Sequence, residues 1–91
     1  MFTVKTTSTK DEEEIAREIE RVLTENGVSF KIMGPRLFNC VATERQAESN
    51  FEIMICHIDK LGMSGLYFKR IRGNFWIHKQ ITDKLVSQMK M

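Results

Sequence analysis

The sequence predicts an α+β protein, a two-layer sandwich in which an antiparallel sheet of four or five strands carries two helices on one face. Three observations support this class. Apolar and polar residues alternate in short stretches typical of strands, and apolar residues recur at helical spacing in two longer stretches. The inferred order is strand, helix, four strands, helix. Strands that follow one another directly pair as antiparallel neighbours, and the helices then cover one side of the sheet.

A short strand is predicted at the start of the chain, over Phe2–Thr7. Apolar Phe2 and Val4 alternate there with polar Thr3 and Lys5, and successive side chains of a strand point to opposite faces. We therefore expect Phe2 and Val4 to face the core and Lys5 to face solvent.

The first helix is predicted between Thr9 and Gly27. Thr9 and Glu12 match a capping box at its start, and Gly27 provides the stop. The carboxylates of Asp11–Glu14 lie in the first turn, where the helix dipole favours negative charge. The residues that share the predicted buried face are Ile15, Ile19, Val22 and Leu23.

The middle of the chain predicts two strands and a loop. Apolar alternation favours strands over Val28–Met33 and Leu37–Ala42, and the intervening Gly34–Pro35 is typical of a turn. Thr43–Ser49 is polar and carries charges of both signs, so we expect a loop there.

The most apolar stretch, Phe51–Ile58, is predicted to be a central strand because both of its faces are apolar. Periodicity alone leaves a buried helix open at this position. Leu61–Gly65 is predicted as a connection and Leu66–Ile71 as the last strand, with Leu66 and Phe68 facing the core.

The last helix is predicted to begin after Asn74, whose side chain suits a helix N-cap, and to run to the C-terminus. Its buried face is predicted from apolar residues that recur every four positions: Ile77, Ile81, Leu85 and Met89. Phe75 and Val86 are expected at the margin of this face. Trp76 is expected on the polar side, among the lysines of the helix.

Charge is distributed unevenly along the 91 residues, which are enough for one domain with a modest core. The net charge is only +2, but residues 61–91 hold six cations and one anion, whereas residues 1–30 hold four cations and seven anions. The basic last third favours an anionic partner such as phosphate groups or phospholipid headgroups.

The sequence shows no pattern of an enzyme active site, so we expect no catalytic residue, no metal ligand and no cofactor. His57 and His78 lie in different predicted elements, and His78 is expected to be a partly buried packing residue. Cys40 and Cys56 lie in apolar strand-like stretches and are interpreted as reduced, buried thiols of a cytosolic protein. No stretch predicts a transmembrane segment, so any membrane contact is expected to be peripheral.

The candidate binding site is the basic junction between the last strand and the last helix. Its residues are Lys69, Arg70, Arg72, Trp76, Lys79 and Lys84. Clustered cations beside an exposed Trp suit acidic lipid headgroups, because Trp settles at membrane interfaces, and they also suit a nucleic acid, because Trp stacks on bases. Residue chemistry alone leaves both open.

This junction resembles the central motif of a known family. Phe68–Lys79, Phe-Lys-Arg-Ile-Arg-Gly-Asn-Phe-Trp-Ile-His-Lys, is similar to the kinase-associated domain 1, in which Phe-Lys-Arg-Ile-Ser-Gly precedes a C-terminal amphipathic helix. Phe51–Cys56 resembles that family's Trp/Phe-Glu-x-x-Val-Cys strand, and Met89–Met91 resembles its Leu-Lys-Leu ending. Arg72, in place of a small polar residue, and His78, in place of an aromatic one, depart from the pattern.

The resemblance implies one domain over residues 1–91, forming a C-terminal part of a larger serine/threonine kinase of the microtubule-affinity-regulating type or a fungal relative. It implies the same α+β fold, and it implies binding to acidic phospholipids such as phosphatidylserine, which recruits the kinase to a membrane. Some members of the family also inhibit their own kinase domain. The expected location is therefore cytoplasmic and peripheral at the plasma membrane, with a role in cell polarity.

The family's lipid-contacting pair corresponds to Lys69 and Arg70, and Arg17 and Arg21 on the first helix are candidates for a second basic site. Two alternatives stay open. One is a protein-interaction domain that binds a kinase domain or regulatory subunit instead of lipid, as similar domains of AMP-activated and plant stress kinases do. The other is a small nucleic-acid-binding domain, although we expect no nucleic acid as partner.

Overall fold

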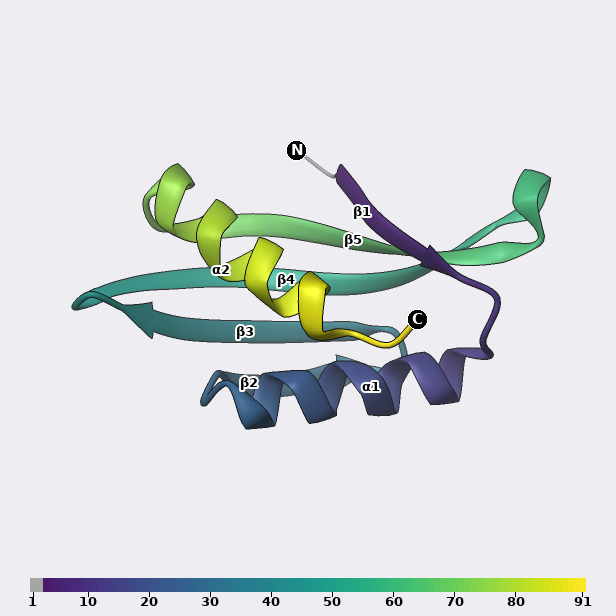
Figure 1. Cartoon of the computed structure of the whole chain (residues 1–91), viewed down its shortest axis with the longest axis horizontal. Helices are drawn as coiled ribbons and strands as arrows, with labels where there is room; N and C mark the ends of the chain where they lie inside the picture. Colours follow the sequence, from purple (N-terminus) through teal and green to yellow (C-terminus); the bar gives the residue numbers. More distant parts are fainter. Residues whose placement is uncertain (1–2) are drawn as a thin grey trace.

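The computed structural model describes residues 3–91 and is a sandwich of two layers (Figure 1). One layer is a five-stranded antiparallel sheet and the other is a pair of helices. In chain order the elements are β1 (Thr3–Ser8), α1 (Glu12–Glu25), β2 (Ser29–Gly34), β3 (Leu37–Glu44), β4 (Ala47–Ile58), the short 3₁₀ helix η1 (Asp59–Leu61), β5 (Met63–Arg72) and α2 (Phe75–Gln88). The predicted fold class and element order are confirmed.

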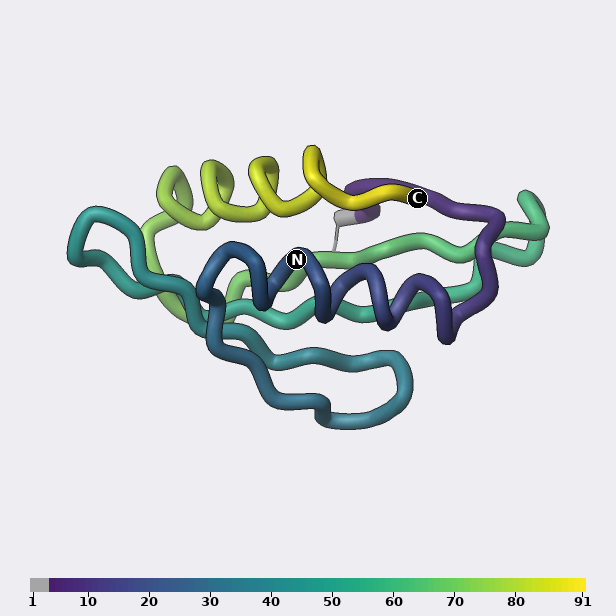
Figure 2. The backbone as a smooth tube through the Cα atoms, turned by 60° about the horizontal axis from the view of Figure 1, so that its bottom comes forward, coloured from purple at the N-terminus to yellow at the C-terminus, as the bar shows by residue number. Residues whose placement is uncertain are grey.

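The strands lie in the order β1-β5-β4-β3-β2, so β4 is the central strand, as its apolar sequence predicts. Both helices cover the same face of this sheet (Figure 2). Helix α1 packs on β2 and β4, α2 packs on β3, β4 and β5, and the two helices contact each other. No helix among residues 3–91 covers the opposite face, which we call the open face of the sheet.

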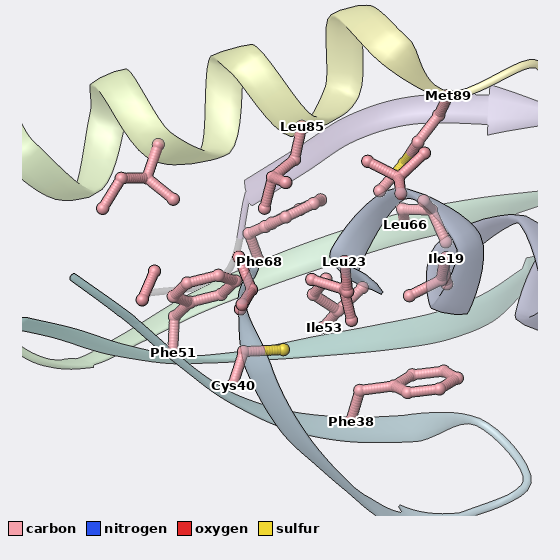
Figure 3. Close-up of a cluster of buried hydrophobic side chains, with 14 of the residues drawn as sticks. Ile19, Leu23, Phe38, Cys40, Phe51, Ile53, Leu66, Phe68, Leu85 and Met89 are labelled. Atoms are coloured by element: carbon pink, nitrogen blue, oxygen red, sulfur yellow. The ribbon is translucent and has the colours of Figure 1, made fainter. Parts of the chain in front are cut away.

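The core lies between the sheet and the helix pair (Figure 3). Side chains of α1, α2, β3, β4 and β5 converge there, among them Phe38, Phe51, Phe68 and Leu85 (Figure 3). Phe51 is fully buried on β4, and its ring stacks on that of Phe68 with centroids 6.2 Å apart. Burying a side chain of this size stabilises the fold by about 1.5–3 kcal/mol. The core therefore fixes the sheet against α2, whose first turn follows directly from β5.

Helix α1 has the predicted buried face, with Ile15, Ile19, Val22 and Leu23 all 1% exposed or less. Its start differs from the prediction. The N-cap is Asp11, whose carboxylate accepts a 2.9 Å hydrogen bond from the backbone N–H of Glu14, so the capping box at Thr9 is wrong. Asp is as good an N-cap as Thr, and Asp11 is closer to the first buried position.

The face assignment predicted for the first strand is wrong at Val4 and Lys5. A register shift between Val4 and Thr6 breaks the simple alternation of β1. Val4 lies 43% exposed opposite Tyr67, whereas Lys5 points toward α2, with its Nζ 3.4 Å from a carboxylate oxygen of Asp83. The prediction for Phe2 lies outside the described residues.

The loop predicted over Thr43–Ser49 is wrong. Strands β3 and β4 continue through it in register, with Glu44 opposite Ala47, and a tight turn at Arg45 and Gln46 joins them. Both turn residues have positive φ, 52° and 65°, the geometry that suits a right-twisted hairpin. The turn could not be predicted because the sequence has no Gly or Asn there, and Arg and Gln adopt positive φ less readily.

Strand β5 begins earlier than predicted, so the connection predicted over Leu61–Gly65 is wrong for its last three residues. Met63, Ser64 and Gly65 pair with the end of β4 instead. Gly65 is buried, and a Cβ there would lie 2.9 Å from the Ile58 side chain. The chain uses Gly at this position for close packing within the strand rather than for a turn.

Helix α2 is capped by Asn74 as predicted, with its side-chain oxygen accepting bonds from the N–H groups of Trp76 and Ile77 at 2.8 and 3.2 Å. Of the predicted buried face, Ile81, Leu85 and Met89 are buried and Ile77 is only half-buried, while His78 and Thr82 are buried as well. The helix ends at Gln88 and does not run to the C-terminus as predicted. Thr82 can be buried because its hydroxyl donates to the carbonyl of His78 at 3.0 Å, which satisfies it within the helix.

Candidate functional site

The junction between β5 and α2 is a tight corner, defined here as residues 70–76 and called the β5–α2 corner. Gly73 turns the chain with φ of 120°, a conformation that other residues rarely adopt. A Cβ on Gly73 would also lie 2.8 Å from the carbonyl oxygen of Glu48 on β4. The corner is therefore fixed by backbone conformation and close packing before α2 begins at its Asn74 cap.

Arg70 is exposed on the helix side of the corner. Its Nη1 donates a 2.7 Å hydrogen bond to the carbonyl of Gly73, and its guanidinium carbon lies 5.9 Å from the centre of the Phe75 ring. No carboxylate in the described part of the chain lies within ion-pair distance of Arg70 or of the equally exposed Arg72. Both charges are therefore available to an anionic partner.

Lys69 lies on the open face of the sheet, opposite Glu52 on β4, and is half-buried. Neighbouring residues of a strand point to opposite faces, so Lys69 and Arg70, which the sequence suggests as one binding pair, flank the sheet from its two sides. A flat partner on either face of the sheet therefore contacts only one of the two.

Three apolar side chains of the corner are exposed to solvent. Trp76 is 67% exposed, as predicted for the polar side of the helix, and its ring contacts Phe75 edge-to-face with centroids 5.3 Å apart. Phe75 itself is 52% exposed and Ile71 is 47% exposed. The sequence interpretation did not identify Ile71 and Phe75 as surface residues. Phe75 was expected at the margin of the buried face, but the first turn of α2 extends beyond the core.

Lys79 and Lys84 differ in how far they are neutralised. The Nζ of Lys79 lies 2.7 Å from a carboxylate oxygen of Asp83, and this hydrogen bond lowers the pKa of the Asp83 carboxyl. Lys84 is exposed and helps to line a pocket of about 310 Å³ between α2, the end of α1 and the β3–β4 turn, where Arg45 also lies. Of these two lysines, only Lys84 has no carboxylate within ion-pair distance among residues 3–91.

Arg17 and Arg21, the candidates for a second basic site, lie together on the solvent side of α1 and are not brought to the β5–α2 corner. Arg21 is engaged in ion pairs with Glu18 and Glu25 at 2.6 and 2.9 Å. The bond from Arg21 is the main cause that lowers the pKa of Glu18 to about 2, and the same pairing raises the pKa of Arg21.

His78 is a packing residue, as predicted, only 8% exposed and in edge-to-face contact with Phe51 at a centroid distance of 5.7 Å. Its Nδ1 is buried with no hydrogen-bond partner among the described residues. Burial lowers the pKa of His78, and the nearby charges of Arg70 and Lys5 lower it further. Burial likewise raises the pKa of the Cys40 thiol to about 12, which keeps it protonated and unreactive.

Residues 3–91 hold no group of three or more His, Cys, Asp or Glu side chains that could bind a metal ion. Among the same residues, no helix combines the length and the apolar character that a bilayer span requires.

Comparison with known proteins relates the chain to protein kinases. The family described as Kinase associated domain 1 matches residues 47–91, from the start of β4 through α2 to the C-terminal residue. The chain is similar to two probable serine/threonine-protein kinases of Dictyostelium discoideum, MARK-C and MARK-A, at 36% identity over all of its length in both cases. It is also similar to the maternal embryonic leucine zipper kinase of Xenopus tropicalis, at 25% identity over 99% of its length. The chain spans 12%, 8% and 14% of these three proteins, respectively.

Proposed function

The chain belongs to the kinase associated domain 1 family, and on that premise we propose that it is a regulatory domain that attaches a serine/threonine protein kinase to membranes. It binds acidic phospholipids such as phosphatidylserine through the β5–α2 corner. This places the kinase at the cytoplasmic side of the plasma membrane. The domain itself contributes no catalytic residue.

One observation carries this proposal: Arg70 and Arg72 are exposed at one corner with no carboxylate of the described chain within ion-pair distance, and Trp76 lies beside them. Each Arg or Lys near an acidic membrane surface contributes about 1 kcal/mol, and the effect falls off within a Debye length. Two arginines with support from Lys84 give a modest, salt-sensitive attachment, which suits a module that binds reversibly.

Co-sedimentation with vesicles tests the proposal. We expect binding to phosphatidylcholine vesicles that contain phosphatidylserine, none to phosphatidylcholine alone, and weakening as salt is raised. The double variant Arg70→Gln/Arg72→Gln should lose about 30-fold in affinity, since two contacts of about 1 kcal/mol are removed.

The matched control is Lys31→Gln/Lys60→Gln, which removes the same charge from exposed positions on β2 and η1. It should change the affinity less than about 3-fold, because these residues lie away from the corner. Equal recovery of the protein with neutral and acidic vesicles would refute the proposal. Tight, salt-steep binding to an oligonucleotide would favour a nucleic-acid partner instead.

The open face of the sheet favours a second candidate function, binding to a kinase domain with autoinhibition as the result. Half-buried Met54, Cys56 and Tyr67 lie on this face and are not covered by a helix of the described chain. The proposed partner for this second function is the kinase domain of the same protein. We expect Met54→Glu to abolish capture of the isolated kinase domain and to leave vesicle binding unchanged.

A further inference from the structure

We propose that the β5–α2 corner penetrates the membrane end-on: Ile71, Phe75 and Trp76 insert into the headgroup region of an acidic bilayer, and Arg70 and Arg72 bind the anionic groups around them. This inference rests on the proposed function and goes beyond it, because it names an inserted apolar tip and an orientation of the whole domain. Attachment by charge alone requires neither an inserted apolar tip nor a fixed orientation of the domain.

The exposed apolar residues of the corner are the first argument. Ile71, Phe75 and Trp76 lie within six residues of one another and are 47%, 52% and 67% exposed. Phe75 and Trp76 contact each other and extend beyond the core, so water surrounds much of both rings. Large apolar side chains clustered on a surface mark an interaction site, and Trp in particular prefers the interface between headgroups and acyl chains.

The position of the cations around this tip is the second argument. The Arg70 guanidinium lies over the Phe75 ring and is held there by its bond to the Gly73 carbonyl. Arg72 is exposed on the same segment. Apolar residues that enter a bilayer beside cations that stay at phosphate depth are the combination by which peripheral proteins hold to acidic membranes. An apolar protein partner would instead leave these two charges desolvated without a counter-ion.

The long axis of the molecule supplies the orientation. The domain measures 39 × 24 × 23 Å, and the β5–α2 corner lies at one end of the longest dimension beside the β3–β4 turn (Figures 1 and 2). The N-terminus of α1, with the acidic run Asp11–Glu14, lies toward the other end, where η1 also lies. A negatively charged surface repels this acidic end and attracts the corner, so the field itself turns the domain end-on.

The sheet geometry also favours the end-on orientation. Lys69 lies on the open face and Arg70 on the helix side of β5. A domain lying flat on either face would point one of these residues away from the membrane.

The fluorescence of Trp76 tests the inference directly, because it is the only Trp of the chain. On acidic vesicles we expect its emission to shift to shorter wavelength and to be quenched by lipids that carry bromine on their acyl chains. The variant Ile71→Ser/Phe75→Ser keeps every charge and the probe, and it should weaken acidic-vesicle binding about 10-fold or more, because apolar insertion is lost.

A matched control uses two other exposed apolar residues, Ile32 and Met33 on β2, which are 57% and 59% exposed. Ile32→Ser/Met33→Ser should leave vesicle binding and the Trp76 signal unchanged. If this variant weakens binding as much as the corner variant, the tip is wrongly placed. If the protein binds acidic vesicles but Trp76 is neither shifted nor quenched, binding is superficial and this inference fails while the proposed function stands. Absence of any vesicle binding overturns both.

Discussion

An arginine donates to a backbone carbonyl both at the β5–α2 corner and at the C-terminal segment, but only the arginine at the C-terminal segment is also paired with carboxylates. Residues 88–91 are held against α1 and against Ser8 of β1, whose hydroxyl donates to the Met91 carbonyl, by a network that we call the C-terminal clamp. Glu18 accepts bonds from Arg21 and from the backbone N–H of Lys90, Arg21 donates to the Gln88 carbonyl, and Lys10 donates to the Lys90 carbonyl at 2.6 Å. At the corner, Arg70 and Arg72 meet no carboxylate of residues 3–91.

The type of a residue therefore does not decide whether its charge stabilises the fold or stays available to a partner. Arg21 and Arg70 are the same side chain, and both bond to a backbone carbonyl. Two glutamates within four positions of Arg21 neutralise it on its own helix, whereas β5 offers no acid near Arg70. We therefore expect substitutions in the clamp to act on stability and substitutions at the corner to act on binding.

The largest loss of stability is expected from Gly73→Ala, which tests whether the backbone of the corner is rigid. The new Cβ meets the Glu48 carbonyl oxygen at 2.8 Å, and φ of 120° disfavours Ala. Strain of this kind predicts a loss of about 2–4 kcal/mol in the free energy of unfolding, measured by urea denaturation. Gly34→Ala is the control, since a Cβ there meets nothing within 4 Å. Equal stability of the two variants would show that the corner yields easily.

The clamp is tested by Glu18→Gln, which should lower the free energy of unfolding by about 1–2 kcal/mol at neutral pH. The folded pKa of Glu18 lies at about 2, below its ordinary value of 4.5. Its contribution is therefore fully present above about pH 4.5 and is lost as the pH falls toward 2, so variant and wild type should converge there.

The exposed Glu13→Gln is the control for this substitution and should stay within about 0.5 kcal/mol of the wild type. Vesicle binding of Glu18→Gln should be unchanged at neutral pH. A weakened affinity would contradict the separation of the two regions.

A smaller effect is expected at His78, which connects the corner to the core. Burial holds its pKa below the ordinary 6.5, with Arg70 and Lys5 as further causes. Because the folded pKa is the lower one, the contribution is complete above pH 6.5 and declines as the pH falls below it. His78→Phe should remove this part of the pH dependence in denaturation measured between pH 7 and 5. A decline of the same size in the variant would mean that another group titrates.

The smallest effects separate the lysines of α2 by affinity for acidic vesicles. Lys79→Gln should weaken binding less than about 2-fold, because Asp83 already neutralises Lys79, whereas Lys84→Gln should cost about 5-fold. Asp83→Asn should raise the affinity about 2- to 5-fold at low salt, since it frees both Lys79 and Lys5. Identical losses for the two lysines would show that the Asp83 pair opens at the membrane.

The fold class, the order of the elements, the central position of β4 and the N-cap at Asn74 could all be predicted from the amino-acid sequence. Each of these depends on local patterns, such as apolar period or a capping side chain, that neighbouring residues encode. The contacts between residues that are distant in the sequence depend on the tertiary structure instead. Lys5, from the other end of the chain, joins Lys79 in an ion pair with Asp83. Lys69 and Arg70 point to opposite faces of the sheet. The exposure of Phe75 has the same origin: the sequence places Phe75 at the margin of the buried face, and the extent of the core beneath α2 leaves it in solvent.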